Sequence, residues 1–204
     1  MRRTISPERF GTYERLADGD ELAAFYLYTL NAALGSAFHG PLQALEVALR
    51  NSVHALMTAA EGRAWYDTAP LHETQRAAIR GARQALRRER KPETPGGIIA
   101  STNLGFWVGL FAKRYDASLW RPVLHRAFDP TPARRRVHGQ LDRVRTLRNR
   151  IAHHEPIVQR NLRADYETIL WLLDLLSSVK AAWVRHYSRV PDILRASNTT
   201  LHRF

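Results

Sequence analysis

Residues 145 to 157 read RTLRNRIAHHEPI and bring several chemically useful side chains into one short segment. Arg148 and His153 form the most informative pair, because a guanidinium can bind a phosphate while an imidazole transfers a proton. Cleavage of a phosphodiester bond needs both functions close together. The segment is therefore a candidate phosphate-directed site, with His154 as a second imidazole next to His153.

The position of these residues in their helix follows from Pro156, which disfavours the α conformation in the residue before it. The helix that carries Arg148 is predicted to end near His153 or His154, where the negative end of the helix dipole favours a protonated imidazole. Arg148 and His153 are about 140° apart around the helix axis. Asn149 and His153 are four residues apart and share a face, which favours His153 over His154.

Other interpretations of the segment start from the same residues. Basic helix ends that carry a histidine are common on protein surfaces. Metal binding by His153, His154 and Glu155 is not expected, because adjacent helical residues point about 100° apart. The chain contains no cysteine, no G-x-S-x-G elbow and no Walker-type loop. Thiolate metal sites, serine or cysteine nucleophiles and nucleotide hydrolysis are accordingly disfavoured.

The composition of the whole chain bounds its organisation and its partners. Its 204 residues, 45% of them hydrophobic, predict one domain over residues 1–204, with a core at about 6–187 and a loosely held tail at 188–204. The net charge of +12 makes polyanions such as RNA the first partners to consider. The lack of cysteine suits a reducing cytoplasm, and the start MRRTISPERF is not followed by the apolar stretch of a secretion signal.

Apolar residues recur at steps of three and four along most of the chain, which predicts an all-α bundle of about six to eight helices. The expected helices cover residues 7–17, 21–38, 41–61, 72–91, 100–115, 117–128, 131–154 and 161–187. Residues 22–45 are long and uncharged enough to cross a bilayer. Gly40-Pro41 is expected to divide them into two buried helices that meet at a turn, so a membrane span is not predicted.

The expected helix over residues 72–91 places a stripe of arginines opposite an apolar face. The stripe consists of Arg76, Arg80, Arg83 and Arg87. This stripe predicts either a surface that binds the phosphates of an RNA backbone or a helix face exposed to solvent. Other candidate RNA contacts lie on the motif helix: Arg134, Arg135 and Arg136 near its start, and Arg145 and Arg150 beside the motif.

Aromatic residues at helical spacing could stack on bases, but they are more often part of a core. We expect most of them to be buried. They are Trp65, Tyr66, Phe106, Trp107, Trp120 and Trp171.

The ten residues from 148 to 157, RNRIAHHEPI, resemble the signature of the HEPN superfamily, in which arginine and a polar residue precede three spacers and a histidine. Three further segments resemble its Abi-like branch, the abortive-infection proteins of bacteria. They are SPERFGTYERLADGDELAAFYLYTLNAAL, LQALEVALRNSVHALM and TNLGFWVGLF. The four segments occur in the expected order, and the resemblance spans roughly residues 6 to 185.

The resemblance implies a helical homodimer that cuts RNA, without a metal or other cofactor, at a cleft where two motif helices meet. It implies that Arg148 binds the scissile phosphate, that His153 takes part in proton transfer and that Asn149 holds one of them in place. Attack by a 2′-hydroxyl would leave a 2′,3′-cyclic phosphate. The corresponding role is phage defence or a toxin-like activity, restrained by a small structured RNA or a protein antitoxin.

The same residues are also compatible with two functions other than catalysis. One is a non-catalytic HEPN module that binds RNA, or a regulatory partner, through the same basic surface. The other is a purely structural dimer.

Two further positions of the resemblance involve carboxylates. Glu46, three spacers and Arg50 match a second motif of the superfamily, for which we expect a structural role in which Glu46 holds Arg148 or Arg150 from the facing helix. Glu155 stands where one HEPN group carries a tyrosine that a nucleotidyltransferase modifies, so that regulation is not expected. His154 follows Arg148 after five spacers and is the alternative to His153.

Overall fold

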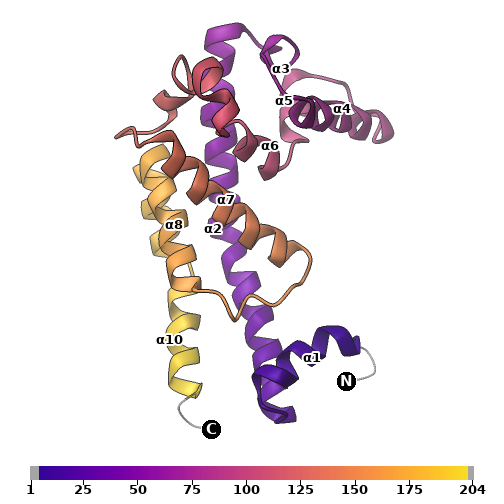
Figure 1. Ribbon diagram of the computed structural model, residues 1–204, viewed down its shortest axis with the longest axis vertical. Helices are drawn as coiled ribbons and strands as arrows, with labels where there is room; N and C mark the ends of the chain where they lie inside the picture. The colour runs from indigo at the N-terminus through magenta and orange to yellow at the C-terminus, as the bar shows by residue number, and fades with distance from the viewer. Residues whose placement is uncertain (1–4, 202–204) are drawn as a thin grey trace.

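The computed structural model describes residues 5–201, with side chains for residues 5–196, and in this range the chain forms helices, turns and loops but no strands (Figure 1). The predicted all-α class is confirmed. One long helix, α2 (Glu21–Glu61), runs along most of the molecule, and the other helices pack beside it. They are α1 (Pro7–Leu16), α3 (Trp65–Thr68), α4 (Glu73–Arg88), α5 (Pro95–Ala100), α6 (Leu104–Gly109), α7 (Arg134–Ala152), α8 (Leu162–Leu176), α9 (Ser178–Tyr187) and α10 (Val190–Leu201), with short turns η1 (Lys113–Tyr115), η2 (Asp116–Trp120) and η3 (Leu124–Ala127).

Helix α2 continues through Gly40 and Pro41, so the expected division into two helices is wrong. Pro41 has no N–H group to offer the preceding turn, which costs a helix interior about 3 kcal/mol. Buried side chains on both sides of the proline belong to the same core: Leu34, Phe38, Leu42, Leu45 and Leu49. Burial of each contributes about 1.5–3 kcal/mol, so the shared core outweighs the local cost. Within residues 5–201, no helix has the length and apolar content that a membrane crossing requires.

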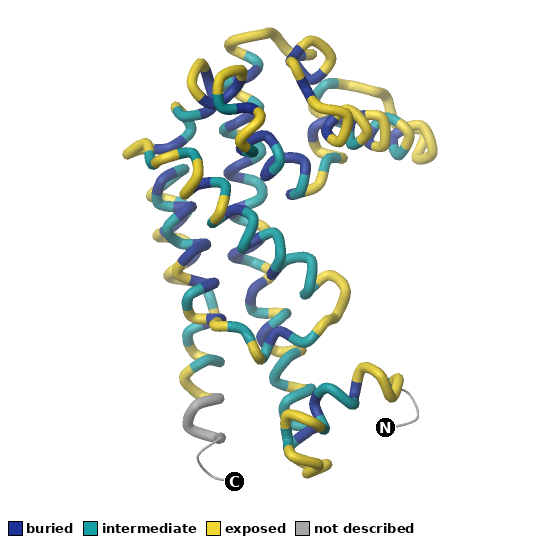
Figure 2. Tube along the Cα trace, in the orientation of Figure 1, coloured by how far each residue is buried: buried dark blue, intermediate teal, exposed yellow. Residues whose placement is uncertain are grey.

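Helix α7, which carries the motif, packs against α8 and α2. Its buried side chains are Val137, Leu141, Val144 and Leu147. Asp165 of α8 is 1% exposed and accepts hydrogen bonds from Arg143 Nε at 2.6 Å and Arg160 Nε at 2.9 Å. Because a buried carboxylate needs charged partners, these contacts tie α7 to the start of α8. Figure 2 shows the buried positions along the inner faces of α2, α7 and α8.

The C-terminal part of the chain differs from the prediction in two places. The expected helix over residues 161–187 is interrupted at Ser177, whose extended backbone separates α8 from α9 and whose hydroxyl accepts a hydrogen bond from the Lys180 N–H at 3.4 Å. The tail expected to be loosely held begins with α10, in which Val190 is buried and Ile193 packs against the core. The last three residues of that tail lie outside the described residues.

The region from α3 to η3 forms the other end of the molecule, where α4 projects to one side (Figure 1). The helix expected over residues 100–115 is shorter than predicted, because α6 ends at Gly109 and the chain continues into η1. Gln75 of α4 occupies the space beside Gly109, where an added Cβ would lie 2.2 Å from its Nε2. The Tyr115 hydroxyl donates a hydrogen bond to Gln75 Oε1 at 2.9 Å. These contacts join α4 to the turn after α6.

Besides the shared core, a histidine of α2 makes a hydrogen bond to α3. The indole N–H of buried Trp65 donates a hydrogen bond to His54 Nδ1 at 3.0 Å. Burial, with a smaller contribution from the nearby Arg50, lowers the pKa of His54 below its ordinary value. The neutral imidazole is the form that accepts this hydrogen bond, so the attachment of α3 to α2 depends on an unprotonated His54.

Candidate functional site

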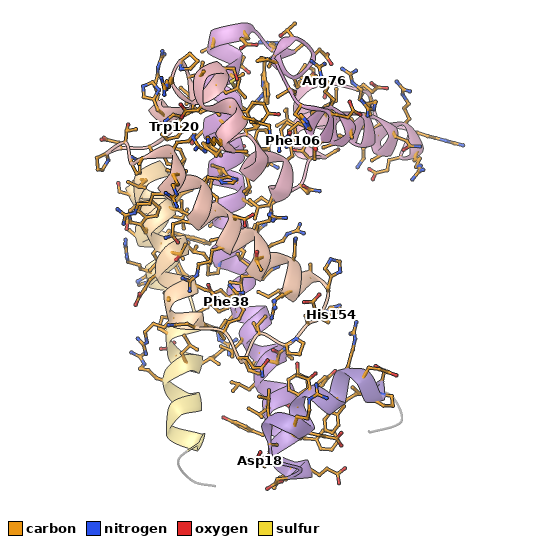
Figure 3. All side chains as sticks on the ribbon, in the orientation of Figure 1. Asp18, Phe38, Arg76, Phe106, Trp120 and His154 are labelled. Carbon is orange, nitrogen blue, oxygen red and sulfur yellow. The ribbon has the colours of Figure 1, made fainter. Side chains whose placement is uncertain are left out.

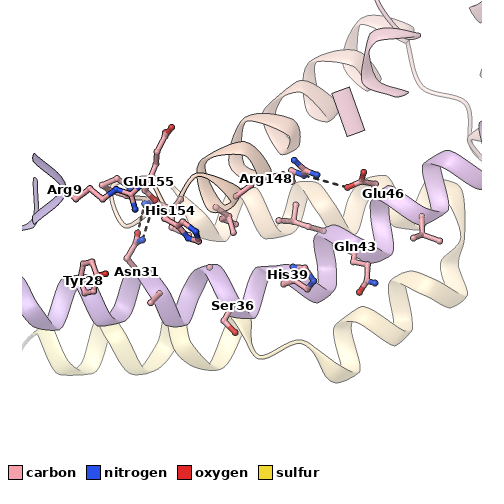
Figure 4. A pocket seen from close by; sticks show the side chains of 18 of the residues that line it. Arg9, Tyr28, Asn31, Ser36, His39, Gln43, Glu46, Arg148, His154 and Glu155 are labelled. Carbon is pink, nitrogen blue, oxygen red and sulfur yellow. Dashed lines mark hydrogen bonds and ion pairs between the residues drawn. The ribbon is translucent and has the colours of Figure 1, made fainter. Parts of the chain in front are cut away.

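A groove of about 970 Å³ lies between α2 and the C-terminal part of α7 (Figure 4). Arg148 and His154 line one wall, and Arg9 of α1 lies at one end. The α2 wall carries polar side chains that recur at helical spacing: Asn31, His39, Gln43, Glu46 and Arg50. The groove therefore collects arginine and histidine side chains from three different elements.

Of the three residues predicted to be catalytic, Arg148 lines the groove. Asn149 is half-buried on α7, His153 is exposed at the C-cap of the helix, and neither belongs to the groove lining. The backbone carbonyl of His153 accepts a hydrogen bond from Arg9 Nη2 at 3.4 Å. Arg148 and His154 thus line the same groove, whereas Asn149 and His153 do not.

The chain leaves α7 through a Schellman turn. The His154 N–H donates to the Ile151 carbonyl at 3.1 Å, and the Glu155 N–H donates to the Arg150 carbonyl at 2.8 Å. His154 has a φ of 55°, in the left-handed region where glycine is usual at this position. A side chain there costs on the order of 1 kcal/mol. Asp18 and Arg90 have the same left-handed backbone just after the C-caps of α1 and α4, so this conformation is a feature of how the helices end.

Two further sets of contacts hold the end of α7. Arg150 Nε lies 3.9 Å from Glu155 Oε2, and its Nη1 donates to the Pro156 carbonyl at 3.4 Å. Asn31 of α2 accepts a hydrogen bond from the Ile157 N–H at 2.6 Å and donates from Nδ2 to the Glu155 carbonyl at 3.5 Å. Arg150 and Glu155 therefore stabilise the turn itself, while Asn31 fastens the following residues to α2.

Glu46 makes the contact expected of it. Its Oε2 lies 3.9 Å from Arg148 Nε, across the two facing helices. Arg50 instead donates from Nε to Asn51 Oδ1 at 3.2 Å, so an ion pair between Glu46 and Arg50 is not the contact that either side chain makes. A long, partly exposed pair contributes less than about 1 kcal/mol. Arg148 can therefore exchange Glu46 for another anion at little cost.

Several groove residues were not predicted as site residues from the sequence. His39 and Gln43 had a usable signal, because they fall in step with Glu46 on the polar face of an otherwise apolar helix. Asn31 had none, because its partners are backbone atoms more than a hundred residues away. Arg9 contacts a carbonyl group in the same way.

The arginine stripe of α4 is engaged within its own region. Its ion pairs are Arg80 with Glu73, Arg83 with Asp67 and Glu93, and Arg87 with Glu93. Arg76 donates from Nε to the Leu71 carbonyl at 2.9 Å. Figure 3 shows Arg76 on the projecting α4, well separated from His154. The stripe and the groove are thus different surfaces.

The other predicted RNA contacts on α7 also have intramolecular partners. Arg134 is bonded to Asp116 and to the Phe111 carbonyl, at 3.1 and 2.6 Å. Arg145 Nη2 donates to Asp142 Oδ1 at 2.7 Å. Arg135 and Arg136 are exposed, and the Arg136 guanidinium lies 4.6 Å from the centre of the Trp171 ring.

The aromatic residues divide into a core set and an exposed set. The expected burial is confirmed for Trp65, Tyr66, Phe106, Trp107 and Trp120. Trp171 is half-buried beneath Arg136. Trp183 and Tyr187 of α9, which the sequence analysis did not single out, are exposed.

Within residues 5–201, no three histidine, aspartate or glutamate side chains are grouped so that they could hold a metal ion. The chain matches no protein-family model, no curated protein and no solved structure.

Proposed function

We propose that the chain is a metal-independent endoribonuclease of the Abi-like HEPN type, that it acts on RNA in the cytoplasm, and that the groove is its active site. The observation that carries the proposal is that Arg148 shares the groove with two histidines from different elements, His39 and His154. An arginine for the phosphate and two imidazoles for the protons are sufficient for cleavage by a neighbouring hydroxyl.

In the proposed reaction, the Arg148 guanidinium binds the non-bridging oxygens of the scissile phosphate. A neutral imidazole accepts the proton of the 2′-hydroxyl as this oxygen attacks phosphorus, and a protonated imidazole donates a proton to the departing 5′-oxygen. The bond between phosphorus and the 5′-oxygen breaks, which leaves a 2′,3′-cyclic phosphate and a 5′-hydroxyl. His39 and His154 are the two imidazoles, and atoms and electrons balance without a further reactant.

The charges of the groove support binding of a phosphate chain. Arg50 has a neutral amide as its hydrogen-bond partner and Arg9 has a carbonyl, so neither guanidinium is neutralised by these contacts. The carboxylate of Glu46 stands 3.9 Å from Arg148, beyond hydrogen-bond range. A polyanion entering the groove therefore gains charge-assisted hydrogen bonds without having to break strong ion pairs.

The proposal assigns proton transfer to His154, whereas the family resemblance implies His153. The observation that favours His154 is that it lines the groove together with Arg148, whereas His153 does not. We also propose that the protein pairs as a homodimer. The two imidazoles of one groove supply both proton transfers within a single chain, so the second copy need not contribute one of them.

The test is cleavage of total RNA by the purified protein in EDTA, with analysis of the product ends. We expect products with cyclic phosphates, and losses of roughly 100-fold or more for His39→Ala and for His154→Ala, because each removes a proton-transfer group. Gln43→Ala is the matched control, since Gln43 lines the same wall one turn from His39 and cannot transfer a proton.

Other results would change the assignment. A large loss in His153→Ala with none in His154→Ala would return the role to His153. RNA binding by the wild type without cleavage would favour the non-catalytic RNA-binding module instead.

A further inference from the structure

Helix α9 exposes three large apolar side chains on one face. Val179, Trp183 and Tyr187 are 78%, 53% and 65% exposed, and they recur at steps of four residues. The rings of Trp183 and Tyr187 lie with their centroids 5.5 Å apart. Exposed aromatic pairs of this kind are uncommon on soluble domains and mark interaction sites.

The two rings border a second hollow of about 230 Å³, between α2 and the segment that joins α9 to α10. Arg189 and the hydroxyl-bearing residues Ser36 and Ser188 also line it. The α2 side of the hollow is built from small residues, namely Ala33, Ala37 and Gly40. These small residues leave room on the α2 side of the hollow for a ring that approaches Trp183 and Tyr187.

Charge around the hollow distinguishes between possible occupants. Lys180, His186 and Arg189 are basic or ionisable, and none of the described residues that line the hollow is acidic. The carboxylates of residues 174–196 are Asp174 and Asp192, and each is paired with an arginine. A second copy docked here face to face would bring like charges together, whereas a nucleic acid offers rings to stack and phosphates to neutralise.

The hollow and the groove are neighbours on α2, because Ser36 lines both of them. Figure 4 shows Ser36 on the side of α2 that is turned away from Arg148. The surface of α2 between them is exposed at Ala32, Ala33 and Ser36. An RNA chain that lies in the groove can therefore reach the rings of α9 by crossing this surface.

We infer that the hollow is a base-binding site for single-stranded RNA, in which a nucleobase stacks on Trp183 or Tyr187 while the neighbouring phosphates lie toward the groove. Stacking on an aromatic face requires an unpaired base, so the site selects single strands over duplexes. The inference rests on the proposed function for the position of the RNA backbone. The stacking contact itself is measured as binding, independently of cleavage.

The test measures the affinity of the full-length protein for a short fluorescent oligoribonucleotide and for the duplex of the same sequence. Trp183→Ala is expected to weaken single-strand binding about tenfold and Trp183→Phe to retain most of it, because loss of one stacked base has an effect of this size. Val179→Ala is the matched control, since Val179 is exposed on the same helix but does not line the hollow. Its affinity is expected to stay within about twofold of the wild type, because no base stacks on it.

Three outcomes overturn the inference. They are unchanged single-strand binding in Trp183→Ala, equal weakening for single strand and duplex, and a change of oligomeric state in Trp183→Ala without a change in RNA affinity. The last result would identify a protein interface.

The two proposals fail in different ways. Weaker binding in Trp183→Ala together with an inactive wild type supports the base site and overturns the ribonuclease. Cleavage by the wild type, together with undiminished RNA binding in Trp183→Ala, supports the ribonuclease and overturns the base site.

Discussion

Two arginine-rich surfaces of this protein differ in the groups that their guanidiniums contact. On α4, Arg80, Arg83 and Arg87 each pair with a carboxylate of the same region. In the groove, Arg9 and Arg50 contact neutral groups. Both surfaces are rich in arginine, but the carboxylates contact Arg80, Arg83 and Arg87 of α4 directly, whereas Glu46 stands 3.9 Å from Arg148 in the groove.

The comparison shows why net charge predicts a polyanion partner but not the surface that binds it. A guanidinium already bonded to a carboxylate must lose that partner before it binds a phosphate. The free energy lost with the ion pair then largely cancels the free energy gained from the phosphate contact. A guanidinium bonded to a carbonyl or amide keeps its charge. The α4 stripe is therefore expected to be a solvated face, and the groove is expected to account for the affinity.

The largest expected effect is the difference in RNA cleavage rate between two single variants, each of which lacks one arginine of one surface. Arg148→Ala should lower the rate of RNA cleavage by roughly 100-fold or more, because it removes the proposed donor to the developing phosphate charge. Arg80→Ala should leave the rate within about twofold, because it removes only half of an exposed ion pair. Single-turnover cleavage assays on both variants measure the difference, and circular dichroism checks that both are folded.

Comparable losses in the two variants would mean that α4 contributes to catalysis or binding, and the contrast between the surfaces would not hold.

A smaller effect is expected from Asn31, which holds the end of α7 over the groove. Asn31→Ala removes two hydrogen bonds to the segment after α7 and should lower the free energy of unfolding by about 1–3 kcal/mol. Cleavage should fall about tenfold, because His154 is no longer held at a fixed distance from Arg148. Denaturant unfolding and cleavage are measured on the same preparation.

Thr29→Ala is the control for Asn31→Ala. Thr29 is exposed on the same helix outside the groove lining, and its hydroxyl donates a hydrogen bond to the Phe25 carbonyl one turn earlier. A variant at Asn31 that loses stability without losing cleavage rate would show that the groove tolerates movement of the α7 end.

The smallest expected effect is a change in how the free energy of unfolding depends on pH. It arises at the contact between α2 and α3 and should leave the groove unaffected. Because burial lowers the pKa of His54 from 6.5, the unfolded chain binds a proton at this residue more readily than the folded chain. The free energy of unfolding should therefore fall as the pH drops below 6.5, and the fall should end once the folded His54 is also protonated. His54→Asn keeps an acceptor for Trp65 and should flatten this dependence.

Thermal unfolding between pH 7.5 and pH 5 measures the slope. The pH profile of cleavage should be the same in His54→Asn and in the wild type, since His54 does not line the groove. An unchanged stability slope in the variant would show that another group is responsible.

Local chemistry predicted the elements whose ends are set by a few residues. Ser6 and Pro7 mark the start of α1, and Pro156 places the end of α7 correctly to within two residues. The contact between Glu46 and Arg148 could also be anticipated, because both side chains lie on facing helices.

The errors arose where long-range packing outweighs local preference. Pro41 reads as a helix start, yet the core on both sides of it keeps α2 continuous. Ser177 interrupts an apolar run with no proline or glycine to mark the break. In the groove, the proposal of His154 rests on the turn after α7, whose left-handed residue spacing on an ideal helix cannot reveal, and the prediction of His153 stays open to the cleavage test.

Asn31 touches the segment after α7 through main-chain atoms, which every amino acid supplies. The hydrogen bonds of Asn31 therefore do not depend on which side chain occupies position 155. During evolution, position 155 can change at the cost of one weak ion pair, whereas a change at Asn31 would remove both hydrogen bonds that join this segment to α2. The residue that constrains the segment after α7 therefore lies on α2, far from the motif in sequence, where a search for catalytic signatures would not look.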